Sequence, residues 1–163
     1  MTQKLVVIGA GMASGRVLEH LTEAAPDAFD ITLLNAEPRG NYNRLMLSPV
    51  LSGEKTYDQI VTHDADWYAA RGVNCRFGEA VVRIDREHRV VYSSAGSAPY
   101  DRLVIATGSA PFIVPVPGKD LRGVCTYRDL EDTNAMIAAS APGKKAVVIG
   151  GGLLGLEAAA GMA

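Results

Sequence analysis

Cysteine is scarce in this sequence: its 163 residues include only two, Cys75 and Cys125. They stand fifty residues apart and form no Cys-x-x-Cys pair, so neither a redox dithiol nor a zinc site is indicated. We expect both to be partly buried thiols in a reducing cytosol. The sequence predicts no metal-binding residue.

The chain also lacks a large net charge of either sign. The chain has 16 Lys and Arg against 18 Asp and Glu, a formal net charge of −2, so nucleic acid is not expected as a partner. No apolar run approaches the roughly 18 residues of a membrane span, and the start of the chain does not have the shape of a signal peptide. We therefore expect a cytoplasmic protein with no membrane partner.

Short apolar runs that end in glycine are what the sequence does contain. Residues 5–8 and 31–34 are rich in branched apolar side chains, and a helical pattern lies between them. Strand, helix and strand within about 35 residues form a βαβ unit, whose crossover implies a parallel sheet.

The rest of the chain gives weaker signals. Residues 38–56 are expected to be irregular and residues 65–71 helical, before a buried strand over 103–106. Three short strands, over 75–77, 80–84 and 90–92, are expected to form an antiparallel meander.

A cluster of prolines marks a linker after the last of these strands. Pro111, Pro115 and Pro117 fall close together, and a helix over 129–141 and a strand over 146–149 are expected beyond them. We predict an α/β fold with two domains: a Rossmann-like first domain over 1–115, with a parallel sheet and an antiparallel β-meander, and the linker and first βα unit of a second Rossmann-like domain over 116–163.

The first glycine loop follows the opening strand and matches a dinucleotide-binding pattern. Gly9 would form the tight turn, Gly11 would let the backbone approach a pyrophosphate, and a small residue, Ser14, would let helix and strand pack closely. Amides at the start of the helix would face the phosphates. The predicted cofactor-binding residues of this loop are Gly9, Ala10, Gly11, Met12, Ala13 and Ser14.

An acidic residue at the end of the second strand would bind the ribose hydroxyls of the same dinucleotide. Glu37 stands there and is the predicted ribose ligand, while the neutral Asn35 is the weaker choice.

A second glycine loop, Gly-Gly-Gly-Leu-Leu-Gly over 150–155, repeats the opening pattern of the chain. The chain contains one internal sequence repeat, VVIGAG at 6–11 and VVIGGG at 147–152. Two such loops indicate two bound dinucleotides with electrons passing between them. The predicted binding residues of the second loop are Gly150, Gly152, Leu153, Leu154 and Gly155.

The order of glycine loop, Ala-Thr-Gly strand end, proline-rich linker and second GxGxxG resembles the FAD- and NAD(P)-dependent pyridine-nucleotide oxidoreductases. The segment 37–55, with Tyr42-Asn43-Arg44-Leu45, and the run GGGLLGLE over 150–157 are similar to the large subunit of assimilatory NAD(P)H nitrite reductase. The resemblance covers essentially the whole chain.

This resemblance implies FAD at the first loop and NAD(P)H at the second. It places Arg44 near the FAD phosphates and ribose, Val81 at the adenine through its backbone, and Thr107 and Gly108 close to the flavin. No catalytic residue is predicted, because the flavin carries the chemistry. Siroheme and an iron–sulfur cluster would belong to a part farther downstream, and a small subunit or electron-acceptor domain would be the partner.

Two departures from related families narrow the prediction. The Cys-x4-Cys of disulfide reductases is missing after the first βαβ unit, and Pro49 stands where rubredoxin and ferredoxin reductases often have lysine. A reductase of rubredoxin, ferredoxin or nitrate reductase remains an alternative, as does an inactive dinucleotide-binding fragment. With the second domain and the end of the first missing, we expect an exposed apolar patch and little or no FAD binding or nitrite reduction by this chain alone.

Overall fold

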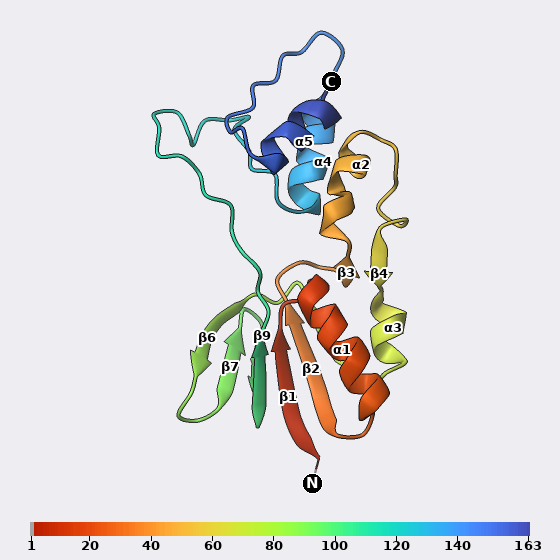
Figure 1. The fold of residues 1–163 in the computed structure, drawn as a ribbon. Helices are drawn as coiled ribbons and strands as arrows, with labels where there is room; N and C mark the ends of the chain where they lie inside the picture. The colour runs from red at the N-terminus through yellow and green to blue at the C-terminus, as the bar shows by residue number, and fades with distance from the viewer. Residues whose placement is uncertain (1) are drawn as a thin grey trace. The chain divides into compact units, whose positions relative to one another are not determined.

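The computed structural model describes residues 2–163 (Figure 1). Contacts divide the chain into two compact units: residues up to Tyr42 with Val61–Gly108, and Asn43–Ile60 with Ser109–Ala163. The units are defined by contacts within the folded chain and not by sequence ranges. The domains predicted over 1–115 and 116–163 therefore stay predictions. Among the described residues, no helix has the length and apolar character needed to cross a bilayer.

A parallel sheet forms the centre of the first unit. Its strands are β1 (Gln3–Ile8), β2 (Phe29–Asn35), β5 (Asn74–Phe77) and β9 (Arg102–Ile105), in the order β5-β2-β1-β9. All three pairings are parallel, which confirms the parallel sheet predicted from the opening βαβ pattern.

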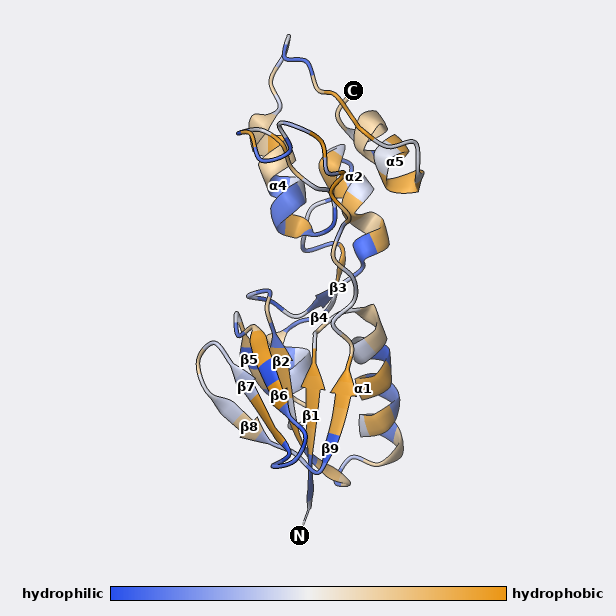
Figure 2. Ribbon diagram, turned by 90° about the vertical axis from the view of Figure 1, so that its left-hand side faces the viewer, coloured by the Kyte–Doolittle hydropathy of each residue, from blue (hydrophilic) through white to orange (hydrophobic). Residues whose placement is uncertain are grey.

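Both faces of this sheet are covered, which explains why its strands are continuous apolar runs. Leu5 and Val7 point into a core with Leu18 of α1 (Met12–Ala24), whereas Val6 and Ile8 point into a second core on the opposite face. Tyr68 of α3 (Ala65–Ala69) lies in the first core. Figure 2 shows β1 and β9 coloured mostly as hydrophobic strands.

The opposite face of the sheet is covered by the antiparallel meander. It consists of β6 (Val81–Asp85), β7 (Val90–Ser93) and β8 (Ser97–Pro99). The prediction placed 75–77 in this meander, but those residues belong to β5 of the parallel sheet. The third strand of the meander is instead β8, which the sequence did not indicate.

A short antiparallel ladder lies where the chain leaves the first unit and comes back. It joins β3 (Asn41–Tyr42) to β4 (Val61–His63), with Tyr42 opposite Val61. Residues 38–56 were expected to be irregular, yet they also contain the 3₁₀ helix η1 (Arg44–Met46) and the helix α2 (Leu47–Leu51).

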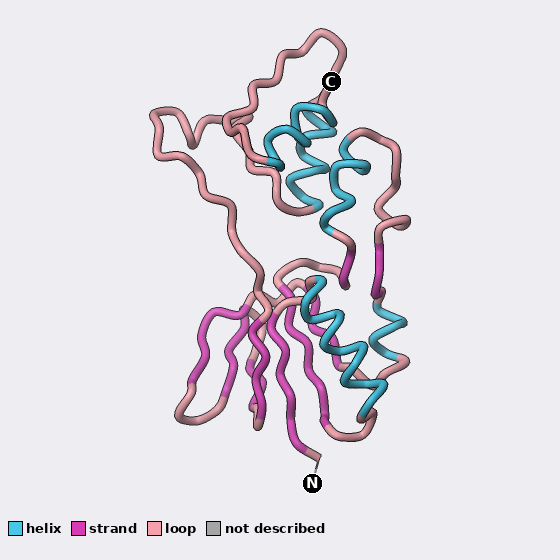
Figure 3. Tube along the Cα trace, viewed as in Figure 1, coloured by secondary structure: helices cyan, strands magenta, loops and turns pink. Residues whose placement is uncertain are grey.

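The second unit contains helices and long loops (Figure 3). Helix α2 packs with α4 (Leu130–Ala139) and α5 (Leu153–Gly161) around Leu51, Met136 and Ala158. Helix α4 lies within the predicted range 129–141, and the Asp129 side chain caps it by accepting from the Asp132 amide.

The strand predicted over 146–149 does not form. These residues have no regular structure, and Val147 and Ile149 are 85% and 77% exposed. A strand is held by hydrogen bonds to a neighbour, and the described part of this unit offers no paired strand for it to join. Its exposed side chains agree with the apolar patch expected from the sequence.

Candidate dinucleotide-binding site

The carboxyl ends of three parallel strands meet at one edge of the sheet. Ile8 of β1 is level with Leu34 of β2 and with Ile105 of β9. The chain runs outward from β1 to β2 and β5 on one side, and β9 pairs with the other side of β1. Such a reversal of strand order opens a crevice at the carboxyl ends, where doubly wound folds bind ligands.

Gly9 makes the tight turn that leads out of β1. Its φ of +98° lies in the left-handed region, and a Cβ on it would collide with the carbonyl oxygen of Ala106. Its amide donates to the Leu34 carbonyl oxygen at 2.7 Å. Gly9 is therefore needed for the contact between the ends of β1, β2 and β9.

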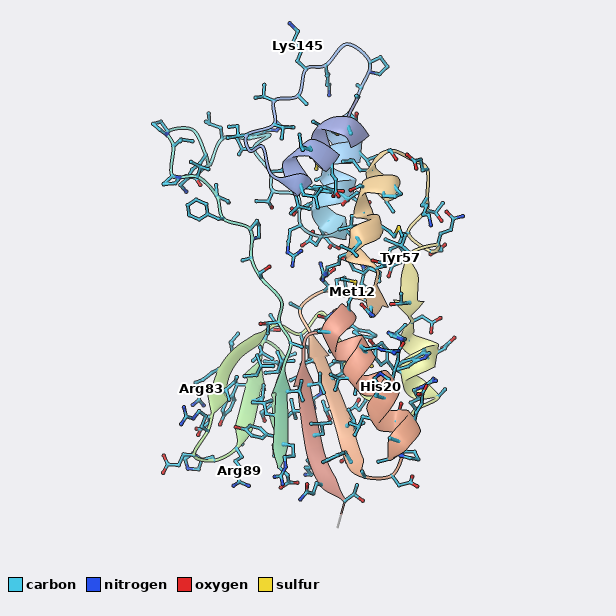
Figure 4. The ribbon with its side chains drawn as sticks, in the orientation of Figure 1. Met12, His20, Tyr57, Arg83, Arg89 and Lys145 are labelled. Carbon is cyan, nitrogen blue, oxygen red and sulfur yellow. The ribbon has the colours of Figure 1, made fainter. Side chains whose placement is uncertain are left out.

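Gly11 has different surroundings. It is the N-cap of α1 and has an ordinary φ of −86°, and a Cβ on it would meet no described atom within 4 Å. None of the described side chains caps this helix end, and no acidic residue lies in its first turn. Met12, at the amino end of α1 in Figure 4, is exposed. Open backbone at a helix N-terminus suits an anionic group.

Close packing of α1 occurs one residue after the position expected from the sequence pattern. Ser14 is fully buried, and its hydroxyl donates to the Gly11 carbonyl oxygen at 3.0 Å. The closest approach to a neighbouring element is at Gly15, where a Cβ would lie 2.6 Å from Asn41 Nδ2 and 2.8 Å from His63 Nδ1. Both small residues are therefore required.

Asn35 ties the glycine loop to the segment that follows β2. Its buried side chain accepts from the Ala10 amide at 3.1 Å through Oδ1. Its Nδ2 donates to the carbonyl oxygens of Glu37 at 3.1 Å and Arg39 at 2.8 Å. The sequence pattern indicated Asn35 only as the weaker choice of ribose ligand and did not predict this role. An amide at the end of an otherwise apolar strand was the available signal.

Glu37 lies on the loop after β2, next to the Asn35 network. It is half-buried, and the Tyr42 hydroxyl donates to its Oε2 at 2.8 Å. This hydrogen bond orients the carboxylate, but the ribose contact of Glu37 stays a prediction.

The other predicted FAD residues fall in both units. Val81 begins β6 and packs partly into the second core, and Thr107 and Gly108 follow β9 as exposed residues of the first unit. Arg44 belongs to the second unit, where it begins η1 after the Asn43 cap. The structure thus brings the glycine loop, Glu37, Val81, Thr107 and Gly108 into one unit, without Arg44.

The second glycine loop has a local conformation similar to that of the first, although no strand precedes it. Gly150 has a φ of +132°, and a Cβ on Gly155 would collide with the Gly150 carbonyl oxygen. Gly152 is the N-cap of α5 and has no neighbour around its Cβ position. Leu153 and Leu154 begin the helix and are 74% and 49% exposed.

The two cysteines differ in environment. Burial raises the pKa of the Cys75 thiol to about 11, whereas Cys125 is exposed, contrary to the expectation that both are partly buried. Both are free thiols. Among residues 2–163, no group of three or more His, Cys, Asp or Glu side chains is arranged to hold a metal ion.

The sequence model of a family described as pyridine nucleotide-disulphide oxidoreductase matches residues 3–163. The chain belongs to this family. Its α/β fold, with a Rossmann-type parallel sheet and an antiparallel meander, is therefore the one predicted.

Relatives within this family include the nitrite reductases named by the sequence resemblance. The chain is 48% identical over 161 residues to "Nitrite reductase [NAD(P)H]" of Bacillus subtilis (strain 168), covering 98% of the chain and 20% of that protein. It is 42% identical to the "Assimilatory nitrate reductase electron transfer subunit" of the same organism, covering 98% of the chain and 21% of that protein. The chain thus spans about a fifth of the length of these relatives.

Solved structures show the same fold. The NADH:rubredoxin oxidoreductase of Clostridium acetobutylicum is 27% identical with a TM-score of 0.85, over 99% of this chain and 42% of that one. A chain of the covalent putidaredoxin reductase–putidaredoxin complex is 30% identical with a TM-score of 0.84, over 98% of this chain and 39% of that one.

Proposed function

We propose that this chain is the electron-entry module of an NAD(P)H-dependent flavoenzyme, with FAD at the first glycine loop and NAD(P)H at the second. In this proposal, electrons pass from NAD(P)H through FAD to a nitrite-reducing centre outside these 163 residues. Membership of the family and identity to nitrite reductases support it. The observation that carries FAD binding is the open backbone at Gly11, at the carboxyl ends of β1, β2 and β9.

The residues at this edge fit the adenosine half of FAD. The amino end of α1 would bind the pyrophosphate through backbone amides, since no side chain among residues 2–163 caps it. Glu37, oriented by Tyr42, would accept from the ribose hydroxyls. Asn35 would keep these two elements at a fixed spacing. Bound FAD itself would supply the chemistry, by accepting hydride and releasing electrons singly.

The chain offers no dithiol for the electrons. Its two cysteines are free and fifty residues apart, although the family is described as pyridine nucleotide-disulphide oxidoreductase. The proposed acceptor is therefore an iron centre or a separate redox protein, supplied by a small subunit or an acceptor domain.

A second candidate is a module that serves another acceptor. The 42% identity to a nitrate reductase electron transfer subunit favours nitrate reductase as the destination of the electrons. Reduction of each acceptor by NAD(P)H, measured with the longer protein that either proposal implies, separates the two.

The assignment of one cofactor to each loop is tested with a matched pair of substitutions. Gly11→Ala and Gly152→Ala both replace an N-cap glycine that has open space at its Cβ position. Each methyl group would block a pyrophosphate while clashing with no described atom. Each variant should therefore lose only about 1 kcal/mol of unfolding free energy, from the weaker cap.

We expect Gly11→Ala to weaken FAD binding at least tenfold and to leave NAD(P)H binding unchanged, with the reverse for Gly152→Ala. Titrations of both cofactors with the longer protein measure this. Unchanged FAD affinity in Gly11→Ala, or the same loss in both variants, contradicts the assignment.

A further inference from the structure

A buried histidine outside the predicted site joins three elements of the first unit. His63 of β4 is only 5% exposed, and both of its ring nitrogens have partners. Nε2 lies 2.7 Å from Glu19 Oε1 on α1, and Nδ1 lies 3.1 Å from Asn41 Nδ2 on β3. The ring of Trp67 on α3 lies 4.0 Å from the His63 ring, centroid to centroid.

The partners assign one proton to the ring. The Asn41 amide nitrogen donates to Nδ1, so Nδ1 carries the lone pair and Nε2–H donates to the Glu19 carboxylate. This arrangement leaves Asn41 Oδ1 buried without a hydrogen-bond partner among the described residues. A buried acceptor without a partner is unfavourable, typically by about 1–3 kcal/mol.

A second proton on His63 would favour the opposite amide orientation. A protonated Nδ1 needs an acceptor, and a half-turn of the Asn41 amide would present Oδ1 to it. The ring would then donate to an oxygen atom on each side, Glu19 and Asn41. The pair would therefore have two discrete arrangements, selected by one proton.

The charged groups around His63 keep Glu19 ionised. The pKa of Glu19 is lowered first by its hydrogen bond from Arg16, at 2.6 Å, and then by His63. The ring of Tyr68 on α3 makes an edge contact with the His63 ring, and the guanidinium of Arg71, which follows α3, lies 4.0 Å from the centroid of the Trp67 ring. The Asp64 carboxylate accepts from the Trp67 amide. Of these groups, Glu19 alone bonds the ring.

The same pair is linked to both parts of the candidate site through one neighbouring residue on each side. Asn41 and His63 pack against Gly15, whose amide donates to the Gly11 carbonyl oxygen at 2.9 Å. Asn41 directly precedes Tyr42, which orients Glu37. Rearrangement of the amide would therefore act on the start of α1 and on the predicted ribose ligand together.

We propose that His63 is a positioning residue of the dinucleotide site. As a neutral ring it fixes α1 against β3 in the arrangement that leaves Gly11 open, and its protonation turns the Asn41 amide and weakens dinucleotide binding. The amide coupling stands on the contacts above, whereas the effect on binding rests on the proposed function of the first loop.

The coupling is tested without cofactor, by NMR of the 163-residue chain. The chain has three histidines, so His20→Gln and His88→Gln identify the resonances of His63. We expect the Asn41 side-chain amide signals to move with the same pH midpoint as the His63 ring signals. Asn41 signals that stay fixed while His63 titrates overturn the coupling.

The effect on binding is tested by FAD titration, between pH 5.5 and 8, of the longer protein that the proposed function implies. We expect FAD affinity to fall at least threefold toward acid pH, with the midpoint of His63, and His63→Gln to remove this fall. His20→Gln, on the exposed side of α1 (Figure 4), is the matched control and should keep it. An unchanged pH profile in His63→Gln overturns the proposal.

A second variant keeps the proposal testable if His63→Gln fails to fold. Asn41→Asp places a carboxylate beside Nδ1, which should hold the ring proton and move the fall in affinity to higher pH by about one unit. An unmoved profile in this variant counts against the proposal. If neither the longer protein nor any of its variants binds FAD at any pH while the amide coupling is seen, the coupling is supported, and the proposed function fails together with the binding effect.

Discussion

At the scale of single residues, chemically similar positions of the glycine loop have separate tasks. Gly9 is required by the backbone, because its φ is +98° and Ala106 leaves no room for a Cβ. No described neighbour requires Gly11, which agrees with its predicted place beside the pyrophosphate. A GxGxx pattern alone does not separate these tasks, since both depend on what lies around the loop.

Among the polar residues around the glycine loop, Asn35 at the end of β2 should contribute most to stability. Its side chain forms hydrogen bonds with three backbone groups. We expect Asn35→Ala to lower the free energy of unfolding by about 2–3 kcal/mol, since the buried Ala10 amide loses its acceptor. Urea unfolding followed by the fluorescence of Trp67, the only tryptophan, measures this in the first unit. Asn74→Ala, an exposed asparagine of β5, is the control. Equal losses in the two variants would contradict the role of Asn35.

At the scale of elements, the strands that could be predicted are those whose apolar side chains indicate that both faces are buried. Residues 5–8 and 31–34 place apolar side chains on both faces, a pattern typical of strands in a sheet that is covered on both sides. Asn74–Phe77 mixes polar and apolar side chains, and nothing in it identifies β2 as its partner. Ser97–Pro99 has little strand preference and forms β8 only because β7 lies beside it.

The candidate site divides in the same way. The glycine loop and Glu37 follow from local spacing, so the sequence could predict them. The bonds of Asn35 to Ala10 and of His63 to Glu19 and Asn41 join residues 22 to 44 positions apart, which only the folded chain brings together. Apart from the amide at the end of an otherwise apolar strand, buried polar networks of this kind have no local signature in the sequence.

The segment 146–149 has the strongest strand pattern of the second unit and yet forms no strand, so its amides should lack protection. We expect hydrogen exchange of residues 146–149 to approach the rate of an unfolded peptide, while β1 amides are strongly protected by β2 and β9. Exchange measured by NMR on the 163-residue chain tests this. Protection at Val147 or Ile149 comparable to that at Val7 would show that the strand forms.

At the scale of the whole molecule, ionised carboxylates make stability depend on pH. The pKa of Asp85 is lowered mainly by hydrogen bonds from His88, and that of Glu19 by Arg16 and His63. A lowered pKa in the folded state stabilises the fold above the ordinary values of 3.8 and 4.5, and this contribution is lost as pH falls through the folded-state values.

We therefore expect the unfolding midpoint of the first unit in urea to fall below pH 4.5, and Glu19→Gln and Asp85→Asn each to reduce that fall. Unfolding curves between pH 3 and 6, followed by Trp67 fluorescence, measure it. Asp30→Asn, an exposed carboxylate of β2, should leave the dependence as it is. A steeper fall in Glu19→Gln would mean that the sign is wrong.

The Tyr42–Val61 pairing has a consequence for how the gene could be divided. Residues 43–60 lie in the second unit, and the chain re-enters the first unit at Val61, directly opposite Tyr42. For protein engineering, residues 43–60 are therefore an insertion between the two strands of a hairpin. Opposed residues of an antiparallel pair lie only about 5 Å apart, a gap that a two-residue Asn-Gly turn can close. A trimmed gene encoding 2–42, such a turn and 61–108 would yield the first unit as one uninterrupted polypeptide. A single proteolytic cut could not release that unit, because the chain crosses its boundary three times.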